Sequence, residues 1–227
     1  TYTSVTPVNP ANDTWYSKQW YLNSSETYSA KVSGAWATET GSPSVTVAII
    51  DTGYTDHPDV DSARIWPGYD FISDSTKSND GDGRDADAHD NGDYVQGGST
   101  PHNSSWHGTH VMGIVGATDN DIGVVGVAPN VKLLPVRVLG PNGGTVSDII
   151  AGIKWAAGIH MTGVPDNPHP AQVINMSIGG SSAGCDSDTE AALAAAKAKG
   201  ITVVTAAGNE NGAAAQSYPG NCYPTIN

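Results

Sequence analysis

The chain has 227 residues, of which 38% are hydrophobic and 15% charged, and 23 Asp and Glu against 10 Lys and Arg give a formal net charge of −13. This apolar content is enough for a buried core, which excludes intrinsic disorder, and the acidic balance excludes nucleic acid as a partner because phosphate backbones bind basic surfaces. No apolar run approaches the roughly 18 residues of a membrane span.

The composition suggests a secreted protein. Residues 1–12 are polar and lack the basic and apolar regions of a signal peptide, so we expect that any targeting segment has already been removed. The chain is rich in Asp, Asn, Gly and Ser, which is typical of extracellular proteins, and there Cys185 and Cys222 would form a disulfide. Two unpaired surface thiols are the alternative.

Apolar runs of strand length alternate with helical patterns along the chain. In chain order we expect a helix over 30–40, a strand over 45–50, a helix over 107–117, a strand over 131–139, a helix over 147–160, a strand over 172–178, a helix over 187–199 and a strand over 201–206. Ser187 with Glu190 predicts a capping box for the last helix, and Gly200 its end. The alternation indicates one α/β domain, residues 1–227, with a parallel sheet. Another strand is expected to begin at 223–226.

An acidic segment interrupts this pattern at about 70–95. Eight aspartates and almost no apolar residues predict a long surface insertion. Calcium takes six to eight oxygen ligands, and the alternation of carboxylates with glycine turns from residue 80 onward resembles a calcium loop. The ligands would be Asp80, Asp82, Asp85, Asp87 and Asp90. A solvated acidic loop without metal is the alternative.

Several strands end in residues that could carry chemistry. Asp51-Thr52-Gly53 places a carboxylate at the carboxyl end of a parallel strand, where open α/β sheets bind ligands. An aspartic protease would need a second such motif, and none is present. His107-Gly108-Thr109-His110 opens a helix, whose dipole should keep His107 neutral, as a general base requires. A zinc site made by His107 and His110 is a less favoured alternative.

Two further strands end in small residues. Ala206-Ala207-Gly208-Asn209 leaves room for a substrate beside an amide that can donate to an oxyanion. Ser177-Ile178-Gly179-Gly180 ends the preceding strand in the same way. Ordinary turns are the alternative for either motif alone.

Together these four motifs, in this order, resemble the subtilisin-like serine proteases (subtilases), and the resemblance extends from Gln19 to Pro224. It implies a doubly wound, mostly parallel sheet with helices on both faces, and a secreted endopeptidase that acts on polypeptides and is made with a cleaved propeptide. Asp51 would orient the imidazole, His107 would take the proton of the nucleophile, and Asn209 would bind the oxyanion.

The resemblance also implies a cleft that pairs with an extended peptide. One edge would be Leu139, Gly143 and Gly144, the other Ser177, Ile178 and Gly179, and the floor of the first specificity pocket Ala206, Ala207 and Gly208. Because this floor is small and uncharged, we expect it to accept large apolar side chains rather than Lys or Arg.

A second calcium site follows from the resemblance alone. The loop at 118–124 and the Asp of His57-Pro58-Asp59 match a strong calcium site of the family, and Asp13 matches an N-terminal ligand of some members. The ligands would be Asp13, Asp59, Thr118, Asn120, Ile122 and Val124. With the acidic insertion, this makes two expected calcium ions.

The family's nucleophile segment, Gly-Thr-Ser-Met-Ala, does not occur in this sequence, since Gly108-Thr109 and Gly144-Thr145 are followed by His and Val. Three explanations stay open. The chain is one part of a nicked enzyme completed by a fragment that carries the serine, a truncated subtilase sequence, or a non-catalytic homologue that binds peptides with calcium. In each case the missing strands and helix should leave an apolar face exposed.

Overall fold

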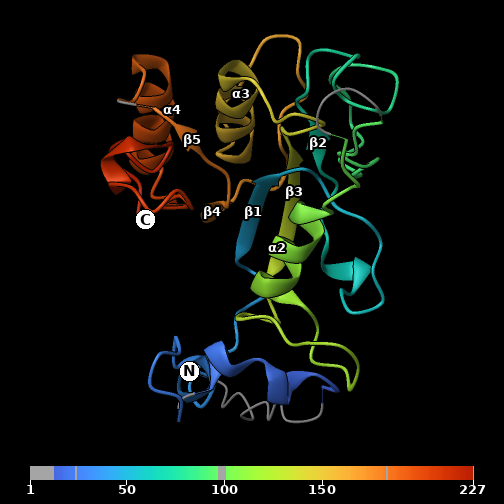
Figure 1. The fold of residues 1–227 in the computed structure, drawn as a ribbon, viewed down its shortest axis with the longest axis vertical. Helices are drawn as coiled ribbons and strands as arrows, with labels where there is room; N and C mark the ends of the chain where they lie inside the picture. Colours follow the sequence, from blue (N-terminus) through green and yellow to red (C-terminus); the bar gives the residue numbers. More distant parts are fainter. Residues whose placement is uncertain (1–12, 24, 97–100, 183, 227) are drawn as a thin grey trace.

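Five short strands form the central sheet of the computed structural model, which describes residues 13–23, 25–96, 101–182 and 184–226 (Figure 1). All neighbouring pairs are parallel. Across the sheet the strands are β2 (Tyr69–Asp70), β3 (Lys132–Arg137), β1 (Thr46–Asp51), β4 (Val173–Met176) and β6 (Thr202–Thr205). The chain thus builds outward from β1 in both directions, which is the order of a doubly wound sheet.

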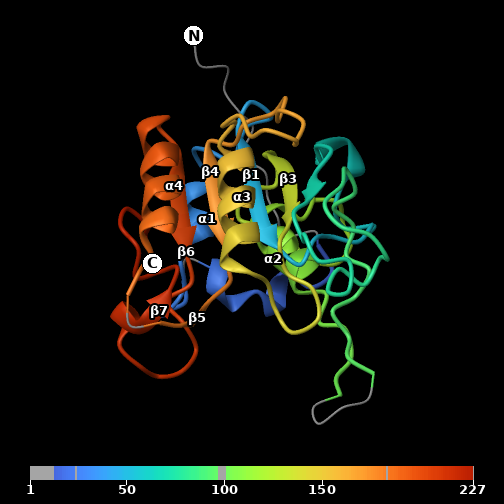
Figure 2. The same ribbon diagram turned by 90° about the horizontal axis from the view of Figure 1, so that it is seen from above.

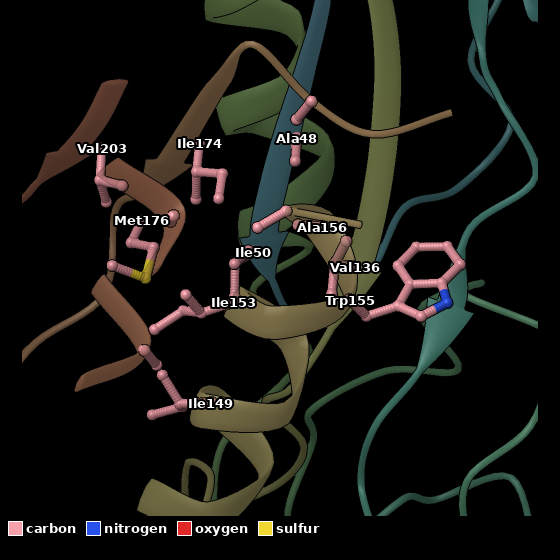
Figure 3. Packing of buried hydrophobic residues seen from close by; sticks show 14 of the residues in the cluster. Ala48, Ile50, Val136, Ile149, Ile153, Trp155, Ala156, Ile174, Met176 and Val203 are labelled. Carbon is pink, nitrogen blue, oxygen red and sulfur yellow. The ribbon is translucent and has the colours of Figure 1, made fainter. Parts of the chain in front are cut away.

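Helices cover both faces of the sheet because β1 alternates between two cores. Ala48 and Ile50 pack with α3 (Val146–Ala156) and α4 (Ser187–Ala198), as Figure 3 shows for Ile50 and Ile153. Val47 and Ile49 face the other way and pack with α2 (His107–Gly116). In Figure 1 the strands β1 and β3 lie between α3 and α2, and Figure 2 shows α3 and α4 side by side. The predicted fold class is confirmed.

Smaller elements complete the described chain. The strands β5 (Gly180–Ser181) and β7 (Ser217–Tyr218) pair antiparallel. Ile226 makes a parallel bridge to Val204, so the residues around 226 pair with β6 where a further strand was expected. The other short helices are α1 (Val32–Ala35) and the 3-10 turns Tyr16–Lys18, Trp20–Leu22, Ser62–Arg64 and Ala214–Gln216.

Three helix boundaries differ from the prediction. The helix expected over 30–40 is a single turn, α1, preceded by Lys31 in a left-handed conformation with φ +60°. The helix expected to reach residue 160 ends at Ala156, and Gly158 follows with φ +64°. The capping box was wrong, because the carboxylate of Asp186, one residue earlier, caps α4 by accepting the Thr189 N–H at 2.9 Å.

The disulfide prediction is confirmed: Cys185 and Cys222 are bonded and link the start of α4 to the loop after β7. Among the described residues, no helix is long and apolar enough to cross a bilayer.

The acidic segment was predicted to be a surface insertion, and this is only partly correct because several of its residues are buried. Asp70 lies in β2 and has no exposed surface. The guanidinium of Arg137, 1% exposed at the end of β3, donates to the carboxylates of Asp70 and Asp80 and to the carbonyl of Ser78. Burial raises the pKa of Asp70 to about 7. The insertion therefore folds around one buried cation.

Arg84 attaches the same segment to the helical layer. Its guanidinium contacts Asp148 of α3, which is 2% exposed, at 2.7 Å, and its Nε donates to the carbonyl of Phe71 at 3.0 Å. These contacts fix the insertion to β2, β3 and α3.

We expect Arg137→Met to lower the free energy of unfolding by about 3–5 kcal/mol, because it leaves two carboxylates without their buried counterion. Lys77→Met is the matched control, since it removes a 4.0 Å pair with Asp74 whose side chains are 53% and 43% exposed, and should cost no more than about 1 kcal/mol. Urea denaturation measures both, and equal losses would contradict this account of the insertion.

Candidate active site

Three strands bring their carboxyl ends to one edge of the sheet. Asp51 ends β1, Ser177 follows β4 and Ala206 follows β6. The strands are in register there, with the Ala206 N–H donating to the Met176 carbonyl at 3.1 Å. The sheet therefore gathers motifs that are far apart in the sequence, at the edge where open α/β sheets place their sites.

Asp51 and His107 form a hydrogen-bonded pair at this edge. The distance between Nδ1 of His107 and Oδ1 of Asp51 is 2.7 Å, and the Thr52 N–H donates to the same oxygen at 2.8 Å. The Asp51 side chain has no exposed surface, whereas that of His107 is 46% exposed. Because a carboxylate only accepts hydrogen bonds, Nδ1 carries the proton and Nε2 of a neutral ring is free to accept one.

Two glycines allow this pair to approach. A Cβ at Gly108 would lie 2.1 Å from the carbonyl oxygen of Gly53, and a Cβ at Gly53, where φ is +96°, would lie 2.5 Å from the carbonyl of Ala88. The first turn of α2 thus rests directly on the backbone of the turn after β1.

The pKa of His107 is raised, whereas the helix dipole was expected to keep the ring neutral. The hydrogen bond that Nδ1–H donates to Asp51 is the largest cause, the charges of Asp51 and Asp93 add to it, and partial burial opposes it. The predicted direction of the His107 pKa shift was wrong because a carboxylate in direct contact outweighs the partial positive charge at the start of a helix. Neutral His107 is therefore the dominant form only at a higher pH than for an ordinary histidine.

A groove of about 510 Å³ runs beside His107, and it contains both predicted cleft edges. The predicted residues that line it are Leu139, Gly143, Gly144, Ser177, Ile178 and Gly179. Gly143 has φ +90° and pairs with Gly140 in a tight turn. Asp93 and His102 also line the groove. Sequence reasoning missed these two, because their separation from the motifs gave no signal that the insertion returns to the cleft.

A second hollow, of about 410 Å³, contains the predicted pocket residues Ala207 and Gly208. Ala206 is not among its lining residues, but Glu210 and Ser217 are. One charged residue therefore adjoins the predicted floor, and which side chains this pocket accepts stays a prediction. Glu210 directly follows Asn209 in the sequence, so its position next to a recognised motif was the available signal.

Asn209 lies in the exposed turn after β6. Its backbone N–H donates to the Glu210 carboxylate at 2.8 Å. Its role as an oxyanion donor stays a prediction. His110, the second histidine of the zinc alternative, lines a different hollow on α2 together with His57.

The predicted family calcium site has buried carboxylate oxygens that no donor of the described residues satisfies. Asp59 is 4% exposed; its Oδ2 accepts the Val124 N–H at 2.8 Å and its Oδ1 has no partner among the described residues. Asp13 is 3% exposed, and its Oδ1 accepts the Asn120 N–H at 3.3 Å while its Oδ2 is unpartnered. Burial raises the pKa of Asp59, and Asp13 raises it further. Buried carboxylates facing one another fit a hard cation.

The neighbouring residues are consistent with this fit. Burial and Asp13 raise the pKa of Asp119 to about 6, and a Cβ at Gly123 would lie 2.1 Å from Asp59 Oδ2. The Trp15 N–H donates to the Gly123 carbonyl at 2.7 Å, which ties the N-terminal segment to the loop 118–124. Thr118 contributes its N–H to the Asp59 carbonyl at 2.7 Å.

Several aspartates of the acidic insertion have protein partners instead. Asp80 binds Arg137, Asp87 contacts His89 at 2.5 Å, and Asp90 accepts hydrogen bonds on both oxygens. Within the part of the chain that the structure describes, no three His, Cys, Asp or Glu side chains converge on a metal position. The calcium site predicted for this loop stays a prediction.

Replacing Asp51 by Asn should lower the pKa of His107 towards its ordinary value, because the main cause of the raised value is removed. NMR titration of the imidazole resonances measures this shift, with the other histidines as internal reference. An unchanged titration of His107 would show that the 2.7 Å contact does not determine its protonation.

Comparison with known proteins agrees with this geometry. A protein-family model with the description "Subtilase family" matches residues 42–227. The chain is 46% identical over 221 residues to an extracellular protease of Xanthomonas campestris pv. campestris and 41% identical over 226 residues to an extracellular basic protease of Dichelobacter nodosus, covering 95% of this chain in each case. A solved protease structure from Pseudoalteromonas arctica superposes with a TM-score of 0.90 at 49% identity over 95% of this chain.

These matches cover only part of the length of the related proteins. The chain spans 37% of the length of each of the two curated relatives and 64% of the solved chain. Since the family match includes the turn after β1, the helix α2 and the strand ends β4 and β6, where the site is assembled, the chain belongs to the subtilase family.

Proposed function

We propose that this chain forms the larger part of the catalytic domain of a secreted serine endopeptidase. The observation that carries the proposal is the 2.7 Å contact between the buried Asp51 and the half-exposed His107, next to a groove that can hold an extended peptide. Family membership and the names of the relatives, both of them extracellular proteases, support it.

In the proposed mechanism each residue has one task. Neutral His107 accepts the hydroxyl proton of the nucleophile on Nε2 while Asp51 holds Nδ1 and stabilises the imidazolium that results. Asn209 donates its side-chain amide to the oxyanion of the tetrahedral intermediate. The protonated His107 then gives its proton to the leaving amine. Because base catalysis needs the neutral ring, the raised pKa of His107 moves the active range to higher pH.

The nucleophilic serine is proposed to come from a segment outside this sequence. Exposed apolar residues on and near α2 support this, since Ile114 is 53%, Val127 41% and Trp106 40% exposed. Ile114 and Trp106 line a hollow of about 590 Å³ together with Gly113. A C-terminal segment packed there would cover these residues and approach His107 from the open side.

The substrate is proposed to be a polypeptide whose main chain pairs with the cleft edges at Gly143 and at Gly179. The carboxylate of Glu210 in the neighbouring hollow makes that pocket compatible with basic as well as apolar side chains. A propeptide that is removed on maturation is part of the same proposal.

Denaturing mass spectrometry of the purified protein, followed by labelling with a serine-directed fluorophosphonate, tests this function. We expect the label on a serine of a segment that this sequence lacks, and His107→Ala should abolish labelling because the base is lost. His160→Ala is the matched control, since His160 is exposed and pairs with the equally exposed Asp166. Absence of label from the complete protein would contradict the proposal and favour a peptide-binding homologue without turnover.

We also propose that Asp13, Asp59 and the loop 118–124 hold a calcium ion that stabilises the fold. The two buried, unpartnered carboxylate oxygens support this site, with Asn120 and the carbonyls of Thr118, Ile122 and Val124 as further ligands. When bound, the ion would neutralise the buried charges and join the N-terminal segment to the domain.

Thermal unfolding with calcium and with chelator measures this effect. Saturating calcium, at about 100 times its Kd, should stabilise the fold by about 2.7 kcal/mol, and Asp59→Asn should remove the response. Asp166→Asn, an exposed carboxylate, is the control and should keep it. Titration calorimetry counts the bound calcium ions. One ion per chain, with its binding lost in Asp59→Asn, would contradict the site predicted at Asp80–Asp90, and no bound ion would contradict both sites.

A further inference from the structure

The first turn of α2, which carries the imidazole of His107, is held by two hydroxyl groups from outside the helix. The His107 N–H donates to Oγ of Ser105 at 3.2 Å, and the Gly108 N–H donates to Oγ1 of Thr52 at 3.0 Å. The first four N–H groups of an α-helix have no intrahelical acceptor, so these hydroxyls act as caps. They fix the part of the backbone from which the imidazole projects.

Both hydroxyls are fixed in turn by aspartates of the acidic segment. Oγ1 of Thr52 donates to Oδ2 of Asp90 at 2.7 Å, and Oγ of Ser105 donates to Oδ2 of Asp93 at 2.7 Å. A hydroxyl has a single proton, and giving it to a carboxylate leaves only lone pairs for the helix amide. The aspartates therefore ensure that each hydroxyl meets α2 as an acceptor.

The pair of Thr52 and Asp90 is the more tightly enclosed of the two. Thr52 is 4% and Asp90 5% exposed. The second carboxylate oxygen of Asp90 accepts the Gly92 N–H at 2.8 Å, and the backbone N–H of Asp90 donates to the Tyr54 carbonyl at 2.8 Å. With both carboxylate oxygens already occupied by protein donors, Asp90 is held in place by the fold itself.

Thr52 also connects this support to the other member of the catalytic pair. Its backbone N–H donates to Asp51 and its hydroxyl accepts from Gly108, the residue after His107. Thr52 thus contacts both the Asp51 carboxylate and the helix turn that carries His107. The direction of the Thr52 hydroxyl decides whether that turn is held next to Asp51.

We propose that Asp90, acting through the Thr52 hydroxyl, is a positioning residue that maintains the hydrogen bond between His107 and Asp51. The relevance of this inference to catalysis rests on the proposed function, but the hydrogen bonds that it describes can be tested without any substrate turnover. It gives the acidic segment a task in the active site that differs from the calcium binding expected for Asp90.

The test is the Nδ1–H resonance of His107 in the purified protein, recorded by NMR, because its downfield position reports the bond to Asp51. Thr52→Val keeps the side-chain shape but removes the hydroxyl, and should move this resonance upfield. The amide proton of Gly108 should exchange about tenfold faster, as expected for the loss of one hydrogen bond. Thr52→Ser retains the hydroxyl and should restore both signals, and Asp90→Ala should reproduce the effect of Thr52→Val.

Thr189→Val is the matched control. Thr189 has no exposed surface, and its hydroxyl donates to Oδ2 of Asp186 at 2.6 Å at the start of α4. Its loss should destabilise the protein to a similar extent while leaving the His107 resonance unchanged. If Thr52→Val and Asp90→Ala behave like this control, Asp90 is purely structural and the inference fails.

If Thr52→Val does not fold, Asp90→Ala makes the same comparison with Thr52 in place. None of these readouts needs substrate turnover. If the variants shift the His107 resonance as expected but the complete protein takes no fluorophosphonate label, only the proposed function is contradicted. If the complete protein is labelled but the variants leave the His107 resonance unchanged, only this inference is contradicted.

Discussion

The carboxylate of Asp51 has no exposed surface, and burying an ionised group without donors costs several kcal/mol. The local structure supplies two donors to its Oδ1, the Thr52 N–H and the His107 imidazole, whereas its Oδ2 has no partner among the described residues. The strand β1 that carries Asp51 lies at the centre of the sheet. The half of His107 that faces the groove stays open. The buried side of the pair thus holds it in place, and the exposed side is available for chemistry.

The charge of −13 makes each buried cation important to the fold. Arg137 lies opposite Asp51 in the register of β1 and β3, and its guanidinium gathers Asp70 and Asp80 from the acidic segment. The segment then continues to Asp90 and Asp93, which support α2 through two hydroxyls. Several of its aspartates are thus bound to protein partners, which allows so acidic a stretch to be ordered beside the candidate site.

The sequence predicted the parts that depend on local pattern. The four main strands are apolar runs, and the motifs at Asp51 and His107 follow directly from strand and helix boundaries, so a parallel sheet brings them together. Contacts between distant residues were not predictable in this way. Arg137 meets Asp70 across 67 positions and Thr52 meets Asp90 across 38, and no periodicity encodes such partners. The charge of Glu210 was visible, but not that Glu210 lines the same hollow as Ala207 and Gly208.

A Cβ at Gly108 would lie 2.1 Å from the carbonyl oxygen of Gly53, so this contact leaves no space for a side chain on the first turn of the helix. The distance between the strand turn and the helix is therefore set by backbone against backbone and cannot be adjusted by gradual substitution. Charge at a distance can still change the pKa of the imidazole without moving this backbone contact, and Asp93 of the insertion raises the pKa in this way. The close contact thus fixes the geometry of the pair, while Asp93 of the insertion adds a smaller charge effect to that of Asp51 on His107.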